Sequence, residues 1–182
     1  ANVYAATPGS APFPVANTSA SEAFPDIDGN LVAFLSNSEV AIHDLTTSQT
    51  TIITNDSVTN GGTKSRDSLK IAGENIFWIE FDTTDSSTKL MMASLGESEA
   101  GPVIYTVSTV EVGTKVEDAE GNIVAFTTPD NNGFSQIHRV TVISNTPPVA
   151  DAGLDQAVIE GDAVNLSGSA TDADGDAITS WA

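Results

Sequence analysis

The chain has 182 residues, enough for one domain or one and a half, and 40% of them are hydrophobic, so it can bury a core and does not have the composition of a disordered protein. Its 25 acidic and six basic residues give a net charge of −19, which repels nucleic acid and anionic lipid and makes both poor partners. The chain contains no cysteine, which excludes disulfides and thiolate metal sites, and it has no apolar run of the roughly 18 residues that a membrane-spanning helix needs.

The first 20 residues form an N-terminal arm that is small, polar and interrupted by three prolines. Residues 2–6 and 13–17 have the composition of short strands. Two interpretations stay open at this point: a flexible arm, or a strand that is donated to a sheet elsewhere.

A glycine-centred unit occurs three times, at Gly29, Gly73 and Gly121. In each copy an aliphatic residue follows the glycine by three positions and an aromatic residue follows it by five. These pairs are Val32 with Phe34, Ile76 with Trp78, and Val124 with Phe126. Because the two positions differ by two, both side chains lie on one face of a strand. We therefore expect Trp78 in the core and Phe77 on the opposite side of its strand.

Short β-rich runs separated by two to five turn residues follow each glycine, and no helical period is visible. The repeats cover residues 21–56, 68–108 and 116–143. The first two contain four candidate strands each, whereas the third meets Ser144 to Pro148, which is unsuited to a regular ladder, before a fourth strand. The prediction is an all-β fold with three four-stranded antiparallel units, the third lacking its last strand.

Two smaller features are interpreted structurally. Lys64 and Arg66 lie in a glycine-containing stretch, residues 60–67, which we expect to be a solvated loop tip. His43 and His138 occur in the third strands of the first and third repeats, which indicates a place in the repeat pattern. No zinc-binding spacing accompanies either histidine.

The last part of the chain has a different residue pattern. A linker at residues 144–148 leads into a segment, 147–182, whose short strand-like runs alternate with glycine and aspartate turns. This pattern fits the opening of an immunoglobulin-like sandwich, but about 35 residues cannot complete a fold that needs about 100.

These features resemble two known families. The glycine spacings of 44 and 48 and the string from Pro25 to Phe34 resemble TolB-type β-propeller repeats over residues 21–143. The stretch from Pro147 to Gly153, with the acidic turn near the C-terminus, looks like the first third of a PKD domain. The resemblances imply propeller-type blades followed by a partial Ig-like unit, as in bacterial and archaeal surface proteins.

Calcium is the metal that the sequence suggests. Asp172, Asp174 and Asp176 place three carboxylates within five residues, a density of hard oxygen ligands that suits Ca²⁺. The PKD resemblance implies a further ligand from the start of that domain, for which Asp151 and Asp155 are the candidates. The alternative is a solvated acidic turn whose side chains accept backbone hydrogen bonds.

The chain offers no serine-hydrolase elbow, no phosphate loop and no single carboxylate pair that stands out, so we expect no enzyme. An extracellular or cell-surface location fits the resemblances, and three N-glycosylation triplets occur, at Asn17, Asn55 and Asn165.

Three blades leave strand edges open, and open edges are pairing templates. Either the chain is a fragment of a longer protein, or copies of it complete one another by strand pairing in a filament, surface layer or adhesive assembly. The alternative function is a glycan- or protein-binding accessory module of a larger secreted protein.

Overall fold

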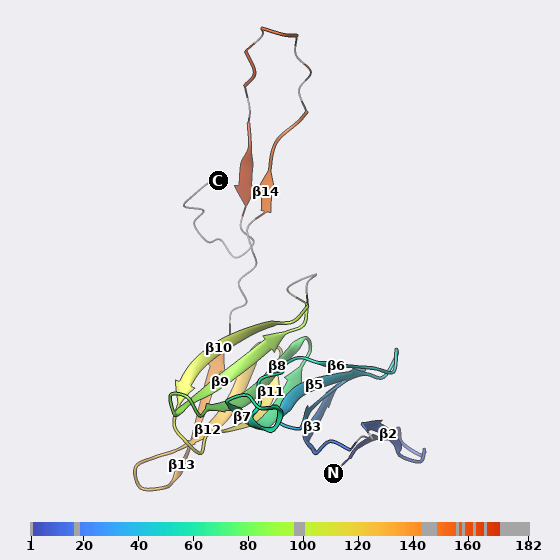
Figure 1. Cartoon of the computed structure of the whole chain (residues 1–182), viewed down its shortest axis with the longest axis vertical. Helices are drawn as coiled ribbons and strands as arrows, with labels where there is room; N and C mark the ends of the chain where they lie inside the picture. The colour runs from blue at the N-terminus through green and yellow to red at the C-terminus, as the bar shows by residue number, and fades with distance from the viewer. Residues whose placement is uncertain are drawn as a thin grey trace. The chain divides into compact units, whose positions relative to one another are not determined.

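The computed structural model describes residues 2–16, 19–96, 101–142, 149–155, 157, 159–161, 163–165 and 167–171. The expectation of an all-β protein is confirmed, because the described elements are strands in antiparallel sheets and one short 3-10 turn, η1 (Val58–Asn60). The chain divides into two compact units, Ala1–Val142 and Ile143–Ala182 (Figure 1).

The first unit begins with an N-terminal hairpin followed by a four-stranded meander, here called the first sheet. The hairpin pairs β1 (Val3–Ala5) with β2 (Phe13–Ala16). The first sheet contains, in spatial order, β3 (Glu22–Asp28), β4 (Leu31–Ser36), β5 (Glu39–Asp44) and β6 (Gln49–Ile52). The N-terminal arm is thus a hairpin of its own, because each of its strands supplies the other's hydrogen-bond partners.

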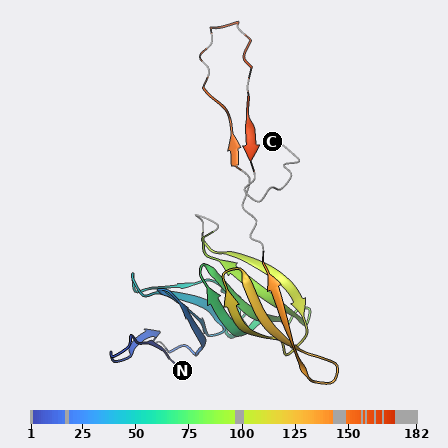
Figure 2. The same cartoon turned by 180° about the vertical axis from the view of Figure 1, so that it is seen from behind.

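Two further meanders follow. The second sheet contains β7 (Lys64–Ala72), β8 (Asn75–Asp82), β9 (Ser87–Ser94) and β10 (Val103–Val110). The third sheet contains β11 (Lys115–Glu120), β12 (Ile123–Pro129) and β13 (Ser135–Thr141), and within the described residues no strand pairs with the outer edge of β13 (Figure 2).

Each repeat glycine begins the tight turn between the first two strands of its sheet. Gly29, Gly73 and Gly121 have φ of 55°, 59° and 57°, a region that L side chains rarely adopt. A positive φ at the first of two turn residues is the pattern of a type II′ hairpin. The same local chemistry therefore starts all three sheets in the same register.

The sheets stack face to face through three apolar clusters. Val32 and Phe34 contact the N-terminal hairpin, Ile76 and Trp78 contact the first sheet, and Val124 and Phe126 contact the second sheet. These residues are the repeated pairs at three and five positions after each glycine, so in every sheet the repeated pair faces the preceding element.

In the first and second sheets, the opposite face of the strands packs against the sheet that follows. Phe77 lies on that face of β8, and both Phe77 and Trp78 are fully buried because the second sheet lies between two neighbours. The expected orientation of these two aromatic residues is confirmed.

Residues 60–67 are not the solvated loop tip expected from the sequence. β7 begins at Lys64, four residues before the expected start of the second repeat, and the Arg66 side chain is 1% exposed. The prediction was wrong because the basic residues have carboxylate partners on neighbouring strands, which a local pattern does not reveal.

The second unit contains one described strand pair, β14 (Val149–Asp151) with β15 (Ser169–Thr171). Val149 opposes Thr171 and Asp151 opposes Ser169. The pair is antiparallel and its residues are largely exposed.

Candidate functional site

The third sheet presents one face that no described element covers. This open face consists of the residues that alternate with Val124 and Phe126 and their partners across the ladder: Ile123, Ala125, Thr127, Ile137, Arg139 and Thr141. It corresponds to the face by which the first and second sheets pack against the sheet that follows them.

The difference in burial at equivalent positions is large. Val40 of the first sheet and Leu90 of the second are both 0% exposed, whereas Ile137, which occupies the same register in the third sheet, is 83% exposed. Ala33 is completely buried and its equivalent Ala125 is only half-buried. The third sheet therefore carries an interface pattern without a partner in the described chain.

A shallow hollow of about 160 Å³ lies on the inner part of this face. It is lined by Asp118, Ala119 and Glu120 of β11 and by Ile123 and Ala125 of β12. Both acidic side chains belong to exposed residues.

The turn that leads from β12 into β13 is held by hydrogen bonds to one side chain. The Asp130 carboxylate accepts hydrogen bonds from the backbone N–H groups of Phe134 and Asn132, both at 2.8 Å. These bonds favour the charged form and hold the pKa of Asp130 below its usual value.

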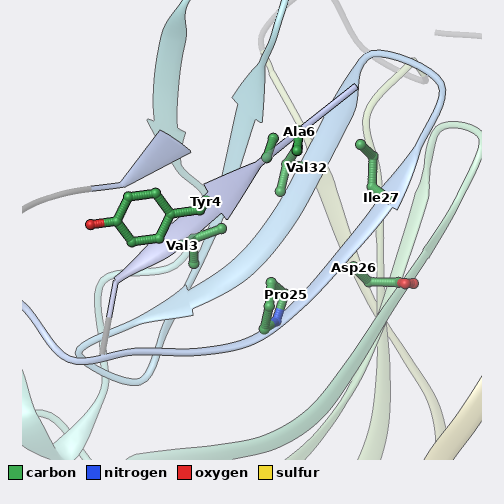
Figure 3. A pocket seen from close by; sticks show the side chains of 8 residues that line it. Val3, Tyr4, Ala6, Pro25, Asp26, Ile27 and Val32 are labelled. Atoms are coloured by element: carbon green, nitrogen blue, oxygen red, sulfur yellow. The ribbon is translucent and has the colours of Figure 1, made fainter. Parts of the chain in front are cut away.

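A second hollow, of about 290 Å³, lies at the opposite end of the stack, between the N-terminal hairpin and the first sheet (Figure 3). Val3 to Ala6 line it from the hairpin, and Pro25 to Ile27 with Val32 line it from β3 and β4. Figure 3 shows Val3 and Val32 pointing into the space between hairpin and sheet, whereas Asp26 points away from it. Ile27 is 55% exposed here, although its equivalent in the second sheet, Ile71, is buried.

The innermost strands of adjacent sheets are linked by acidic side chains. Asp26 of β3 accepts the backbone N–H of Ile71 at 2.9 Å, and Asp28 accepts the backbone N–H of Gly73 at 2.6 Å. Both hydrogen bonds run from β3 to the first strand of the next sheet and its turn. They place the Asp-x-Asp-Gly string of the first repeat in an inter-sheet role that sequence reasoning missed.

A buried ionic group, the Arg66 cluster (Arg66, Glu39, Asp56 and Glu80), joins the first and second sheets. Arg66 donates to Glu39 Oε2 at 2.9 Å and to Glu80 Oε2 at 3.0 Å, and it also bonds Asp56. The Glu39 and Glu80 side chains are 3% and 6% exposed. Since an isolated buried charge is costly, these mutual contacts are what allow the carboxylates to be buried.

Glu39 is held further by neutral donors. Thr54 Oγ1, the Ser57 backbone N–H and Asn60 Nδ2 donate to its carboxylate at 2.7, 2.8 and 2.9 Å. Burial raises the pKa of Glu39, but these hydrogen bonds more than offset that effect and the pKa lies below its usual value.

The predicted calcium ligands are only partly visible. Asp172, Asp174 and Asp176 lie outside the described residues. Asp151 and Asp155 are exposed, and Asp151 Oδ1 accepts the backbone N–H of Gly153 at 2.8 Å. Among the residues that the structure describes, no group of three or more potential metal-ligating side chains occurs.

The two histidines lie on the same face of their sheets but not in matching register. His43 opposes Val32, three positions after its repeat glycine, whereas His138 opposes Phe126, five positions after its own. His43 Nδ1 is 2.8 Å from Thr50 Oγ1, and His138 stacks on Phe126 with ring centroids 5.3 Å apart. The expectation of one shared place in the repeat is therefore wrong by two residues.

No match to this chain is found among protein-family models, curated proteins or solved structures. Within its described part, the chain has no helix of the length and apolar character that crossing a membrane requires.

Proposed function

We propose that this chain is a structural module of an extracellular or cell-surface assembly, in which copies associate through their exposed β-edges and sheet faces. The three sheets act as propeller-type blades, and the C-terminal unit as the beginning of a PKD-like domain. The observation that carries the proposal is the open face of the third sheet, where a position buried twice elsewhere in the stack holds an 83% exposed isoleucine, Ile137.

The free edge of β13 supports the same function. β13 pairs with β12 on one side only, and its outer N–H and C=O groups are a template for another strand. The outward N–H groups belong to the residues that alternate with His138 and Val140, since the Val142 N–H, two residues beyond Val140, bonds Asn122 on the β12 side. Ile137 therefore has an outward-facing N–H.

This geometry permits a sharp test of edge pairing. Ile137→Pro removes one outward N–H and keeps the β12 ladder, whereas the matched control Ile137→Thr keeps the N–H and removes only the apolar side chain. The association of the wild type and both variants is measured by light scattering across protein and salt concentrations, with electron microscopy of the largest species. We expect concentration-dependent oligomers for the wild type and a greater loss for the proline variant.

Salt is included because each copy carries a charge of −19, so that copies repel one another at low ionic strength. Association is expected to strengthen as salt is raised. A wild type that stays monomeric at every concentration and ionic strength would contradict the proposed assembly function.

A binding module is the second candidate, and the hollow beside the N-terminal hairpin favours it. Tyr4 and Pro25 line this hollow, and Tyr4 is 55% exposed. An exposed aromatic ring offers a stacking surface for a sugar. Co-sedimentation with insoluble polysaccharides, compared between wild type and Tyr4→Ala, tests this candidate; equal retention of the two proteins argues against a glycan site here.

A further inference from the structure

From the register that the first and third sheets share, we infer that the open face of the third sheet receives the first sheet of a second copy of this chain, with Asp118 and Glu120 accepting backbone N–H groups of its β3. The inference rests on the proposed assembly function and specifies the interface through which copies join.

The first step is the equivalence of the acidic residues. Asp26 opposes Ala33 and Asp28 opposes Leu31, four and two positions after the repeat glycine. Asp118 opposes Ala125 and Glu120 opposes Ile123, which stand at the same two offsets. Asp118 and Glu120 therefore occupy in the third sheet the places of Asp26 and Asp28 in the first.

As the second step, in the first sheet these acidic residues bond the sheet that follows, whereas the second sheet has Lys70 and Ala72 at the same places. In the first sheet the two carboxylates accept the N–H groups of Ile71 and Gly73 from the next inner strand and its turn. In the third sheet the same places line the 160 Å³ hollow, on an exposed surface. Within the described residues no other sheet donates an N–H group to this pair, and Asp118 Oδ1 accepts only the N–H of its neighbour Ala119 at 3.0 Å.

The third step locates matching donors at the other end of the stack. Ile27 and Gly29 are the equivalents of Ile71 and Gly73, two residues before the repeat glycine and the glycine itself. Ile27 lies in β3 at the 290 Å³ hollow, and Gly29 is exposed in the turn that follows it. One end of the stack of sheets therefore carries acceptors and the other end the corresponding donors.

The charge on the open face also fits a second copy of this acidic chain as the partner. The other five basic residues each form an ion pair, and they are Lys64, Arg66, Lys70, Lys89 and Lys115. Arg139 lies on the open face and has no ion pair within the described part of the chain. A second copy is strongly acidic, so an unpaired base on this face reduces the repulsion between copies.

Docking also involves the N-terminal hairpin of the second copy. Its cluster with the first sheet is small, formed by Val3, Val15 and Ala16 against Val32, Phe34 and Ala41. A three-stranded sheet that stacks on the first sheet needs the space over β4, so docking requires the hairpin of the second copy to leave this cluster.

The interface is heterologous, because the acceptor end and the donor end are different surfaces. Such head-to-tail contacts produce a ring where the rotation closes and a filament where it does not.

The test compares association constants of full-length variants by analytical ultracentrifugation. Asp118→Ala and Glu120→Ala each remove one charge-assisted acceptor, and we expect each to weaken association about tenfold or more. Glu111→Ala is the matched control, because it removes one exposed acidic side chain that belongs neither to the open face nor to its hollow, and it should leave the constant unchanged.

Because the chain has no cysteine, engineered thiols provide a second arm. An equimolar mixture of the single variants Asp118→Cys and Ile27→Cys is oxidised mildly, and dimers are identified by mass. We expect more heterodimer than the half that random pairing gives; the double variant Asp26→Cys with Ile71→Cys reports the same geometry within one chain.

The outcomes separate the two proposals. If Asp118→Ala and Glu120→Ala associate as strongly as the wild type, this interface is overturned but the assembly function is not. A wild type that is strictly monomeric overturns both the interface and the assembly function.

Discussion

Removal of Arg66 is the perturbation whose effect on stability the structure defines most sharply. The variant Arg66→Met keeps a side chain of similar length but deletes the cation that bonds Glu39, Asp56 and Glu80. It also deletes the donor to the Ser38 carbonyl at 3.1 Å.

The expected loss follows from which carboxylates stay compensated. Glu80 retains Lys64, whose Nζ is 3.6 Å from Glu80 Oε1, and Asp56 is half exposed and can be hydrated. Glu39 loses its cation while remaining buried, with only neutral donors left. Breaking a buried ion pair from one side costs about 3–5 kcal/mol. We expect a loss of about 3–4 kcal/mol, near the lower end, because only one carboxylate is stranded.

Urea denaturation followed by circular dichroism measures this loss, provided that the m-value stays constant. Lys70→Met is the control, because Lys70 pairs with Asp26 at 3.8 Å on a partly exposed surface and its removal should cost less than about 1 kcal/mol. The triple variant Arg66→Met, Glu39→Gln, Glu80→Gln should recover part of the loss, since no buried charge is then unpaired. A loss below about 1 kcal/mol for Arg66→Met alone would refute the reasoning.

Three other predictions address the core, acid stability and calcium. Trp78→Ala should destabilise the protein by about 3–5 kcal/mol and Phe126→Ala by less, because Phe126 is only partly buried; urea midpoints decide, and equal losses would contradict this ranking. Since the folded pKa of Glu39 is lowered, its stabilising contribution is present above its ordinary value near 4.5 and is lost as the pH falls below it. Glu39→Gln should therefore show a smaller drop in urea midpoint between neutral pH and pH 3, and an unchanged drop would assign acid sensitivity to other groups. Millimolar Ca²⁺ should raise the melting temperature of the wild type if the carboxylates of residues 172–176 bind it, with magnesium as the control; no shift would count against the site.

The repeat could be read from the sequence because its signal is local. A glycine with positive φ, followed by apolar residues three and five positions later, specifies both the turn and the buried face of the next strand. The three copies consequently predicted most strands, and the orientation of Trp78 and Phe77, without knowledge of any long-range contact.

The Arg66 cluster could not be read in this way, because a bulge changes the register of β7 against β8. Ala72 opposes Asn75 and Lys70 opposes Phe77, but beyond the bulge Arg66 opposes Glu80. Without the bulge, the register from the turn would place Arg66 opposite Phe81, on the other face of the ladder. The bulge includes Ser68, whose φ is 42°, and an ordinary serine gives no sign of that conformation.

The acidic pairs between sheets escaped sequence reasoning for a different reason. In isolation, Asp26 and Asp28 have the appearance of turn-forming residues before Gly29, because aspartate commonly accepts local backbone hydrogen bonds there. Their actual donors lie 45 residues further along the chain, on β7 and its turn. Only the stacking of one sheet on the next brings donor and acceptor together.

The distribution of charge explains how so acidic a chain retains ordered interfaces. Five of the six basic residues are used in ion pairs, and Arg66 and Lys64 are placed where carboxylates are most buried. The surplus negative charge remains on the surface, where it opposes contact between copies at long range. In the proposed assembly, contact between copies would therefore gain its free energy at short range, from apolar burial at residues such as Ile137 and from backbone hydrogen bonds to carboxylates. The two carboxylates of the open face satisfy this condition, because a carboxylate that accepts a backbone N–H contributes attraction where its unpaired charge would only repel.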